Sequence, residues 1–368
     1  IIGHFVASAY VTGTITGAKG SFTVGVYARP YPFIWSPEIG MKRIPTPDDA
    51  PGEALAVNSR GQVVGWYGLG YARRAFLWSE AGGFRDIHPE GDLGPSAARA
   101  INEHGMVAGD ASYGDETFGF GNFGFVLRGD ASRVFSWTDE ITGVYGINED
   151  GAVVGELVIG GPYDPNFPVR SRRAFLWTDL TGVLVLPVAT GTQTSRAFDI
   201  NNNGMIVGYD GAREAGIRNA QVMAPAPVVW NRKSDTPTEL LERKGTGCEN
   251  GWEPLLSYDN PCAAVAVGIN DAGQIAGVIG ERAFRREAGQ NAVMFPEAAA
   301  PSTATGINSR GDISGHVLET GSAIPERVRA AFVWLADGTV RKLGTLPGAV
   351  STYANGINDR GQVVGYVR

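Results

Sequence analysis

The chain has 368 residues, with 31 Lys and Arg against 38 Asp and Glu, which gives a net charge of −7. Hydrophobic residues make up 43% of the sequence and charged residues 19%, a composition that supports a packed core and excludes a disordered chain. The acidic balance, without a basic block, argues against nucleic acid as a partner. No apolar run approaches the ~20 residues that cross a bilayer, so we expect no transmembrane segment.

Glycine is unusually frequent, at 52 residues, and much of it belongs to a repeat. A nine-residue motif recurs seven times: an aliphatic residue, Asn, two variable residues, Gly, one variable residue, Val or Ile, a small or aliphatic residue, and Gly. Its asparagines are Asn58, Asn102, Asn148, Asn201, Asn270, Asn308 and Asn358. They lie 50 residues apart on average, which is the period of a repeat architecture.

Each motif predicts a tight hairpin between two strands. The Asn side chain can accept a hydrogen bond from the backbone two residues later, and the Gly three residues after it can adopt a positive φ. The second Gly falls within the next strand, where a missing side chain allows close backbone approach. An apolar third strand then ends in a large residue before a brief fourth strand. Those end residues are Trp35, Trp78, Leu127, Trp177, Trp230, Phe295 and Trp334.

Four short antiparallel strands in each of seven periods predict an all-β fold, a β-propeller in one domain covering residues 1–368. The strands at 33–45 and the C-terminal hairpin at 357–365 would together form the seventh blade, which removes exposed sheet edges. Residues 1–30 would then be an extra or degenerate N-terminal hairpin outside the ring. The alternative is eight blades, the last of them incomplete.

The repeat resembles the HAF repeat family of extracellular bacterial proteins. The similarity is strongest from Ala330-Ala331-Phe332-Val333-Trp334 through Leu343-Gly344-Thr345-Leu346 to the last Asn–Gly hairpin. One difference is that the family's His before Ala-Phe is replaced here by Arg74, Arg173 and Ala330. The resemblance implies an exported protein that is extracellular, on the cell surface or periplasmic. The family has no established reaction, so the resemblance implies no catalytic residues.

The connections that vary most between repeats indicate where function lies, because binding residues gather on variable loops held by a rigid scaffold. The hairpins within each motif are short and uniform, and they leave one face of a propeller. The connections on the other face look long and irregular, and we expect this long-loop face to be functional. These connections are Asp110–Phe123, Glu156–Arg173, Tyr209–Pro227, Val278–Asn291, His316–Ala330 and, between blades, Arg243–Ala263.

Arginines and tyrosines near these connections are candidate ligand-binding residues. Arg guanidinium groups bind carboxylate, sulfate or phosphate in a bidentate manner, and tyrosine rings can stack on sugars. The candidates are Arg74, Arg173, Arg286, Arg329, Tyr113, Tyr163 and Tyr209. They predict an anionic glycan as ligand, with a protein partner as the alternative. A structural interpretation is that the arginines pair with local acids such as Asp110, Glu156 and Glu326.

Cys248 and Cys262 are the only cysteines, and both fall within an irregular insertion at 243–263. We expect a disulfide between them, because it would clip this insertion and would suit an oxidising compartment.

Motifs of catalysis, cofactor binding and metal binding are missing from the sequence. The four histidines lie in different repeats without metal-ligand spacing, and no nucleophile elbow, Walker loop or dinucleotide fingerprint occurs in context. We therefore expect no catalytic residues, no cofactor and no metal. The predicted function is a non-catalytic binding or assembly module that acts at the bacterial cell surface through the long-loop face.

Two alternatives to a binding module remain at this point. The first is a polysaccharide hydrolase or lyase over the central channel, which carboxylates converging there with Tyr or His would favour. The second is a structural subunit of a surface layer or filament that self-assembles, which an N-terminal hairpin offering a strand to the next subunit would favour.

Overall fold

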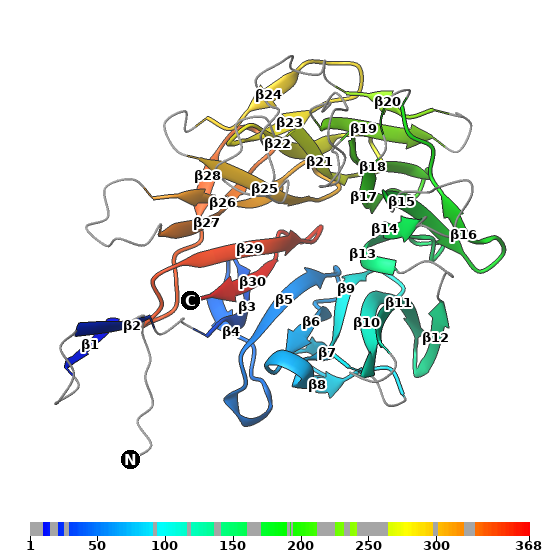
Figure 1. Cartoon of the computed structure of the whole chain (residues 1–368). Helices are drawn as coiled ribbons and strands as arrows, with labels where there is room; N and C mark the ends of the chain where they lie inside the picture. Colours follow the sequence, from blue (N-terminus) through cyan, green and yellow to red (C-terminus); the bar gives the residue numbers. More distant parts are fainter. Residues whose placement is uncertain are drawn as a thin grey trace.

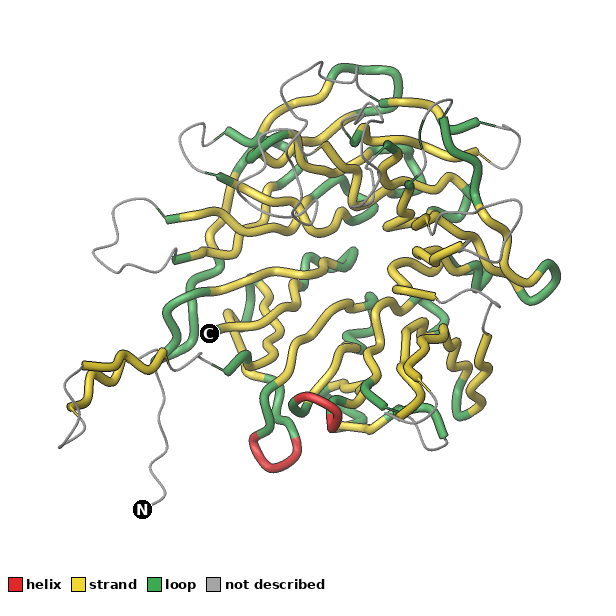
Figure 2. Tube along the Cα trace, in the orientation of Figure 1, coloured by secondary structure: helices red, strands yellow, loops and turns green. Residues whose placement is uncertain are grey.

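The computed structural model is almost entirely β-structure. It describes residues 10–14, 21–25, 29–90, 94–115, 119–135, 141–159, 171–189, 192, 194–211, 225–231, 236–240, 264–296, 301–319 and 328–368. Seven four-stranded antiparallel sheets follow one another around a ring, as Figure 1 shows. Among the described residues the only helical segments are two short 3-10 turns, Pro47–Asp49 and Gly70–Ala72, drawn in red in Figure 2.

Six blades are built from four consecutive strands each, counted from the central axis outward. Blades 1 to 3 contain β5 (Gly52–Val57), β6 (Val63–Tyr67), β7 (Arg74–Ser79) and β8 (Gly83–Asp86); β9 (Ser96–Ile101), β10 (Val107–Asp115), β11 (Gly119–Arg128) and β12 (Ala131–Phe135); and β13 (Ile141–Ile147), β14 (Val153–Ile159), β15 (Ser171–Thr178) and β16 (Gly182–Val185). Blades 4 to 6 contain β17 (Ser195–Ile200), β18 (Met205–Asp210), β19 (Ala226–Asn231) and β20 (Thr238–Glu239); β21 (Ala264–Ile269), β22 (Ile275–Ile279), β23 (Arg282–Arg286) and β24 (Ala292–Met294); and β25 (Ser302–Ile307), β26 (Ile313–Leu318), β27 (Arg329–Trp334) and β28 (Val340–Lys342).

Blade 7 combines the two ends of the chain and closes the ring. Its strands are β29 (Thr352–Ile357), β30 (Val363–Val367), β3 (Tyr31–Ser36) and β4 (Gly40–Arg43). The inner strand β29 contacts β5 of blade 1, so each blade has a neighbour on both sides. The prediction of seven blades is confirmed, and the eight-bladed alternative is wrong. The hairpin of β1 (Tyr10–Thr14) and β2 (Ser21–Gly25) forms a separate sheet outside the ring (Figure 1).

The seven motif asparagines form a continuous ring of hydrogen bonds. Each Asn is buried, and its side-chain Nδ2 donates to the backbone carbonyl of the next blade's motif Asn at 2.8–3.3 Å. The last of these bonds runs from Asn358 to the carbonyl of Asn58 and completes the circle. The side-chain oxygens also accept the turn N–H groups, as expected; that of Asn58 accepts from Arg60 and Gln62. Each Asn therefore both shapes its hairpin and links two blades.

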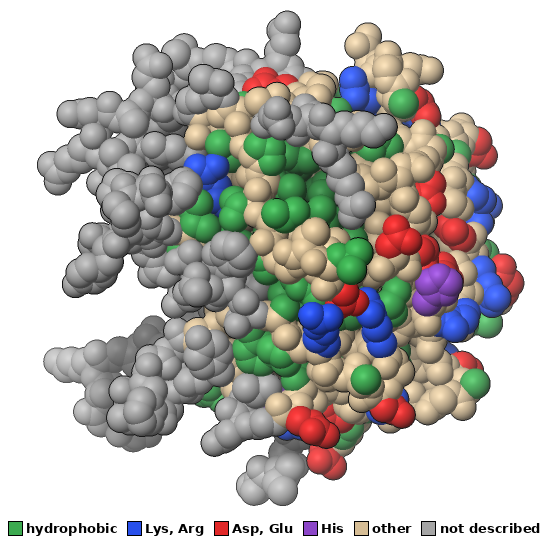
Figure 3. Space-filling view, turned by 90° about the vertical axis from the view of Figure 1, so that its right-hand side faces the viewer, with side chains coloured by type: hydrophobic (Ala, Val, Ile, Leu, Met, Phe, Trp, Pro, Cys, Tyr) green, Lys and Arg blue, Asp and Glu red, His purple; other side chains and the backbone are tan. Residues whose placement is uncertain are grey.

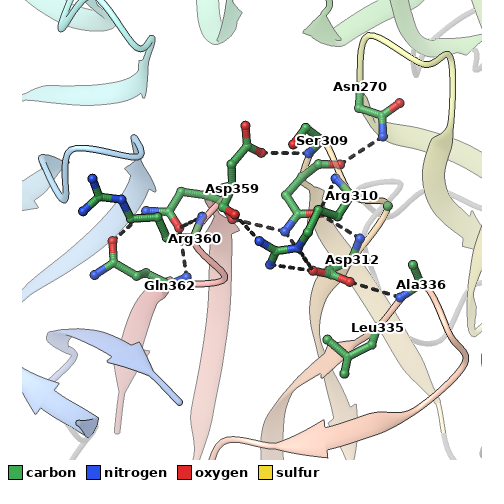
Figure 4. Close-up of polar contacts among 12 residues, drawn as sticks. Asn270, Ser309, Arg310, Asp312, Leu335, Ala336, Asp359, Arg360 and Gln362 are labelled. Carbon is green, nitrogen blue, oxygen red and sulfur yellow. Dashed lines mark hydrogen bonds and ion pairs between the residues drawn. The ribbon is translucent and has the colours of Figure 1, made fainter. Parts of the chain in front are cut away.

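The residue after each motif Asn adds a second set of links. In five junctions its backbone N–H donates to the side-chain oxygen of its counterpart in the next blade, at 2.8–2.9 Å. The accepting residues are Glu103, Glu149, Asn202, Asp271 and Asp359. Figure 4 shows the bond from Ser309 to Asp359 beside the ion pair of Arg310 with Asp312. The frequent acidic residues of these hairpins thus serve blade-to-blade bonding.

Asp199 provides an extra link between blades 4 and 5. It stands in β17 where the other blades have Gly or Ala. Its Oδ2 accepts the N–H of Ile269 at 2.9 Å, and its Oδ1 accepts the N–H of Ile200 at 2.8 Å. The pKa of this carboxyl is raised to about 6, chiefly by burial. The charge of nearby Asp271 also raises the pKa, whereas the two backbone donors lower it.

Both motif glycines have clear structural reasons. The first has φ between +72° and +84° in all seven hairpins, a conformation that residues with a Cβ rarely adopt. The second lies in the second strand beside a bulge of the first. A Cβ on Gly365 would stand 1.9 Å from the carbonyl oxygen of Tyr353, and one on Gly208 would stand 1.8 Å from that of Arg196. The predicted close backbone approach is therefore confirmed.

Blade 5 differs from its sequence-based prediction. The third strand is β23, not a strand ending at Phe295, and Val278–Asn291 contains this strand as well as the end of β22. The short turn at Gly280, with φ of +60°, places Ala283 and Phe284 where other blades have their Ala-Phe pair, and Arg286 occupies the usual Trp position opposite Ile275. Phe295 follows the fourth strand and packs against Phe332 of blade 6.

The connection Asp110–Phe123 is also shorter than predicted. Strands β10 and β11 pair without interruption from Val107 opposite Leu127 to Asp115 opposite Gly119. The ladder extends because the alternating Gly and aromatic residues of β11 continue the strand pattern.

Candidate functional site

Polar and aromatic side chains gather at the long-loop ends of the two inner strands of each blade. Most of them occupy two repeat positions that pair across these strands, five residues before and eight residues after the motif Asn, and three more stand three residues before the Asn. The residues at the second position are Trp66, Asp110, Glu156, Tyr209, Val278, His316 and Tyr366. Small residues face them on the third strand in most blades, for example Ala75 and Ala174. This leaves room for large side chains near the axis.

We call this group the axial cluster. It extends through blades 6, 7, 1, 2, 3 and 4, whereas blade 5 has only Val265 and Val278 at these positions. Its members are Glu53, Trp66, Arg73, Arg99, Asp110, Tyr145, Glu156, Arg172, Arg196, Phe198, Tyr209, His316, Tyr353, Tyr366 and Arg368.

In blades 3 and 4 the charges of the cluster are paired. The carboxylate of Glu156 is fully buried and lies 2.5 Å from Nε of Arg196 and 3.2 Å from Nη1 of Arg172. Arg196 also lies over the rings of Tyr145, Phe198 and Tyr209. Burial raises the pKa of the Tyr145 and Tyr209 phenols, so both stay protonated at neutral pH. This part of the cluster is a closed network of ion pairs and aromatic contacts.

In blades 1 and 2 the cluster contains two arginines and two carboxylates, and only one of these arginines forms an ion pair among the described residues. Arg99 pairs with Asp110 through an Nε to Oδ1 contact of 2.7 Å. Arg73 lies with its guanidinium carbon 5.4 Å from the centre of the Trp66 ring. Glu53 accepts a hydrogen bond from Trp66 and lies 3.9 Å from Arg368, and its burial raises the pKa of its carboxyl.

In blades 6 and 7 the cluster is aromatic. The Tyr353 and Tyr366 rings are stacked with centres 4.6 Å apart and planes 9° apart, and Arg368 lies over both. His316 packs edge-on against Tyr353. Burial and the nearby charge of Arg329 lower the pKa of His316 to about 3, so the imidazole is uncharged at neutral pH.

The structure places the sequence-predicted arginines in different surroundings. Arg74 is exposed, and its Nε lies 2.5 Å from Asp86. This agrees with the interpretation that the arginines pair with local acids. Arg173 is partly buried, and burial lowers its pKa against the opposing charge of Asp210. Arg329 is buried beside His316. Arg286 ends β23 next to the Asn–Gly hairpin, so its assignment to the long-loop face is wrong.

The other predicted residues are divided between the cluster and segments outside the described part. Tyr209 belongs to the axial cluster, although it is buried. The backbone of Tyr113 lies in β10, and Tyr163 falls outside the described residues. Cys248, Cys262 and the insertion at 243–263 also fall outside them, so the disulfide stays a prediction.

Most of the axial cluster was not among the predicted site residues. Glu53, Trp66, Arg99, Tyr145 and Tyr353 lie on the inner two strands, whereas the prediction looked to the third strand and the loops. The sequence contains a signal for one of the positions. When the seven repeats are aligned on their Asn, the residue that directly follows the second motif Gly is large and polar or aromatic in six repeats, and Val278 is the exception.

The outer surface has a different character from the axis. Figure 3 shows the side formed by the outer strands of blades 2 and 3, where basic and acidic side chains are interspersed. Asp179 pairs there with Arg128 and Arg133, and Arg85 pairs with Asp130. The same two blades also have exposed hydrophobic residues: Val134, Leu180, Leu184 and Val185. Such exposed ion pairs contribute little to stability and give this surface no single sign of charge.

Within the described ranges, no group of three or more His, Cys, Asp or Glu side chains is arranged to hold a metal ion. No helix in the same part of the chain has the length and apolar character of a membrane span.

Comparisons with known proteins identify the fold alone. No protein-family model matches the chain, and no curated protein matches it by sequence. Among solved structures, the β-propeller domain of the trilobed protease from Pyrococcus furiosus, which has an open velcro topology, is similar with a TM-score of 0.54 at 11% identity, covering 84% of this chain and 88% of that one. A streptogramin B lyase aligns with a TM-score of 0.45 at 11% identity, covering 92% and 98%. The resemblance to the HAF repeat family stays a prediction.

Proposed function

We propose that the protein is a non-catalytic binding module, exported to the bacterial cell surface, that binds a glycan at the long-loop end of its axis. The observation that carries the proposal is the set of partly exposed aromatic rings in the axial cluster. These rings are Trp66, Tyr145, Phe198, Tyr353 and Tyr366. Export is supported by the resemblance to an extracellular family and by the cysteine pair.

The composition of the cluster suits a sugar better than a flat protein surface. Aromatic faces provide apolar contact area with little conformational freedom to lose, and neighbouring charged groups fix the orientation of a ligand through hydrogen bonds. Both kinds of group stand together at Trp66, which contacts Arg73 on its face and Glu53 through its indole N–H. The strands that hold them are fixed, because each second strand pairs on both sides and each innermost strand pairs with it and contacts the innermost strands of the neighbouring blades, so the site would be preorganised.

A polysaccharide hydrolase is the second candidate, favoured by the raised pKa of Glu53 among aromatic side chains. Glycoside hydrolysis usually needs a second carboxylate that is free to act as base or nucleophile. Asp110 is held by Arg99, and Glu156 is held by Arg172 and Arg196. These ion pairs favour binding over catalysis.

A panel of defined oligosaccharides tests the proposal, with affinity measured by calorimetry and release of reducing ends measured in the same samples. We expect at least one oligosaccharide to bind without cleavage. Trp66→Ala and Tyr353→Ala should each weaken its binding by about tenfold, through loss of aromatic contact area. Tyr71→Ala is the control, because Tyr71 is 78% exposed on a 3-10 turn and is not a cluster member.

Three results would contradict the binding proposal: no oligosaccharide binds, the cluster variants bind like the wild type, or reducing ends accumulate. The last result would favour the hydrolase, and Glu53→Gln should then abolish the reaction.

A further inference from the structure

Arg73 is the one arginine of the axial cluster whose side chain has no ion pair or hydrogen bond within the described part of the chain. It follows the 3-10 turn at Gly70–Ala72, and its backbone is fixed because its N–H donates to Gly70 and its carbonyl accepts from Ser96. The Nε atom is buried without a hydrogen-bond partner. Burial, together with the nearby charge of Arg99, lowers the pKa of Arg73.

The neighbouring acids Asp110 and Glu53 attract this guanidinium but form no ion pair with it. Asp110 is engaged by Arg99 through two contacts, of 2.7 and 3.3 Å. Glu53 accepts from Trp66 and faces Arg368. Across the whole cluster, five arginines stand against three carboxylates, in a chain whose net charge is −7. The surplus of positive charge is therefore local.

Burying a guanidinium that forms no ion pair or hydrogen bond costs free energy, unless a bound ligand supplies the missing partner. The guanidinium of Arg73 stands over the Trp66 ring, so a bound sugar that stacks on the indole would bring its substituents close to this group. Arginine donors match the two oxygens of a carboxylate or a sulfate.

We propose that Arg73 is the specificity-determining residue for an acidic sugar, binding one carboxylate or sulfate substituent while Trp66 contacts the sugar ring. This inference rests on the proposed glycan-binding function and adds the charge of the ligand to it. It also replaces Arg74 of the predicted set by its neighbour, because Arg74 is already paired with Asp86.

The test uses three oligomers of equal length: tetragalacturonate, its fully methyl-esterified form, and a sulfated galactan tetramer. The first two have the same sugar backbone and differ in the methyl esters that remove the carboxylate charge, and the third distinguishes sulfate from carboxylate. Affinities are measured by calorimetry for the wild type, Arg73→Gln and Arg74→Gln at low and high salt. Among the described residues Arg73→Gln breaks no ion pair or hydrogen bond and loses only the contact with the Trp66 ring, worth about 1 kcal/mol, so the variant should melt within about 2 °C of the wild type.

The wild type should bind one of the two anionic oligomers about tenfold more tightly than the ester, as one charge-assisted contact implies. Arg73→Gln should abolish that preference, Arg74→Gln should retain it, and high salt should reduce it. The oligomer that shows the preference identifies carboxylate or sulfate as the group.

Two results would overturn the inference alone: equal binding of anionic and esterified oligomers, or equal losses in the Arg73 and Arg74 variants. In both cases, binding of the ester that depends on Trp66 would leave the proposed function standing. Failure of all three oligomers, and of every other glycan tried, would overturn both.

Discussion

Replacing Asn358 by Ala or by Asp separates the two roles of a motif asparagine. Its Oδ1 accepts the turn N–H groups of Arg360 and Gln362 at 3.1 and 2.9 Å. Its Nδ2 donates to the carbonyl of Asn58 at 2.8 Å and closes the ring between blades 7 and 1. Ala removes both roles, whereas Asp keeps the acceptor for the turn and loses the donor for the ring.

The expected losses follow from the number of backbone groups left without a partner. Ala deprives two N–H groups and one buried carbonyl of their bonds, which at about 1 kcal/mol each lowers the free energy of unfolding by about 3 kcal/mol. An unfolding entropy of about 2.1 cal/mol/K per residue converts this to a fall of about 4 °C in Tm. Asp leaves the Asn58 carbonyl facing a carboxylate, so we expect a loss of about 2 kcal/mol or more.

Chemical denaturation followed by tryptophan fluorescence, together with calorimetry, measures these losses. Arg360→Ala is the matched control, because this exposed side chain of the same turn has no hydrogen bond or ion pair to any described residue, and it should change Tm by less than about 1 °C. A stability of Asn358→Asp equal to that of the wild type would refute the ring, because Asp serves an Asx turn as well as Asn does.

Three further predictions concern other parts of the fold. Gly365→Ala should prevent or strongly destabilise folding, by more than about 3 kcal/mol, because its Cβ would stand 1.9 Å from the Tyr353 carbonyl oxygen; a normal melting curve would contradict this. The pKa of Asp199 is raised from 3.8 to about 6, so the folded state binds the proton of this carboxyl more tightly than the unfolded state does. The free energy of unfolding of the wild type relative to Asp199→Asn should therefore increase as pH falls from 7 to 5. A constant difference would show that the carboxyl does not titrate in this range. Denatured, unreduced protein should contain no reactive thiol, and two free thiols would disprove the Cys248–Cys262 bond.

The sequence was sufficient for the fold where local chemistry repeats. The motif requires a turn residue and two glycines at fixed spacing, so a single rule located seven hairpins and favoured seven blades. It was insufficient in blade 5, where Arg286 takes the place of the large apolar residue that ends the third strand in the other blades. The third strand was therefore not recognised from the sequence. A short Gly280 turn then looked like part of a long loop.

The candidate site was only partly predictable for a related reason. The long-loop face and Tyr209 were identified from the positions of variable connections. Arg73 and Arg74 are adjacent in sequence, and their residue types cannot distinguish them. Only the structure shows that Asp86 pairs with Arg74 and that Arg73 lies over Trp66.

What the sequence by itself determined is the scaffold: an antiparallel propeller with seven uniform hairpins on one face, because turn geometry depends on residues a few positions apart. The pairing of the two chain ends in blade 7, which excludes an eighth blade, was decided by the tertiary structure. The tertiary structure decided how the repeats are joined and which charges remain unbalanced. The Asn ring links residues 38 to 300 positions apart, and the pKa of Arg73 depends on nearby charges in two blades. Residues so far apart in the sequence come into contact only when the ring closes, so a pattern of neighbouring residues does not reveal these contacts.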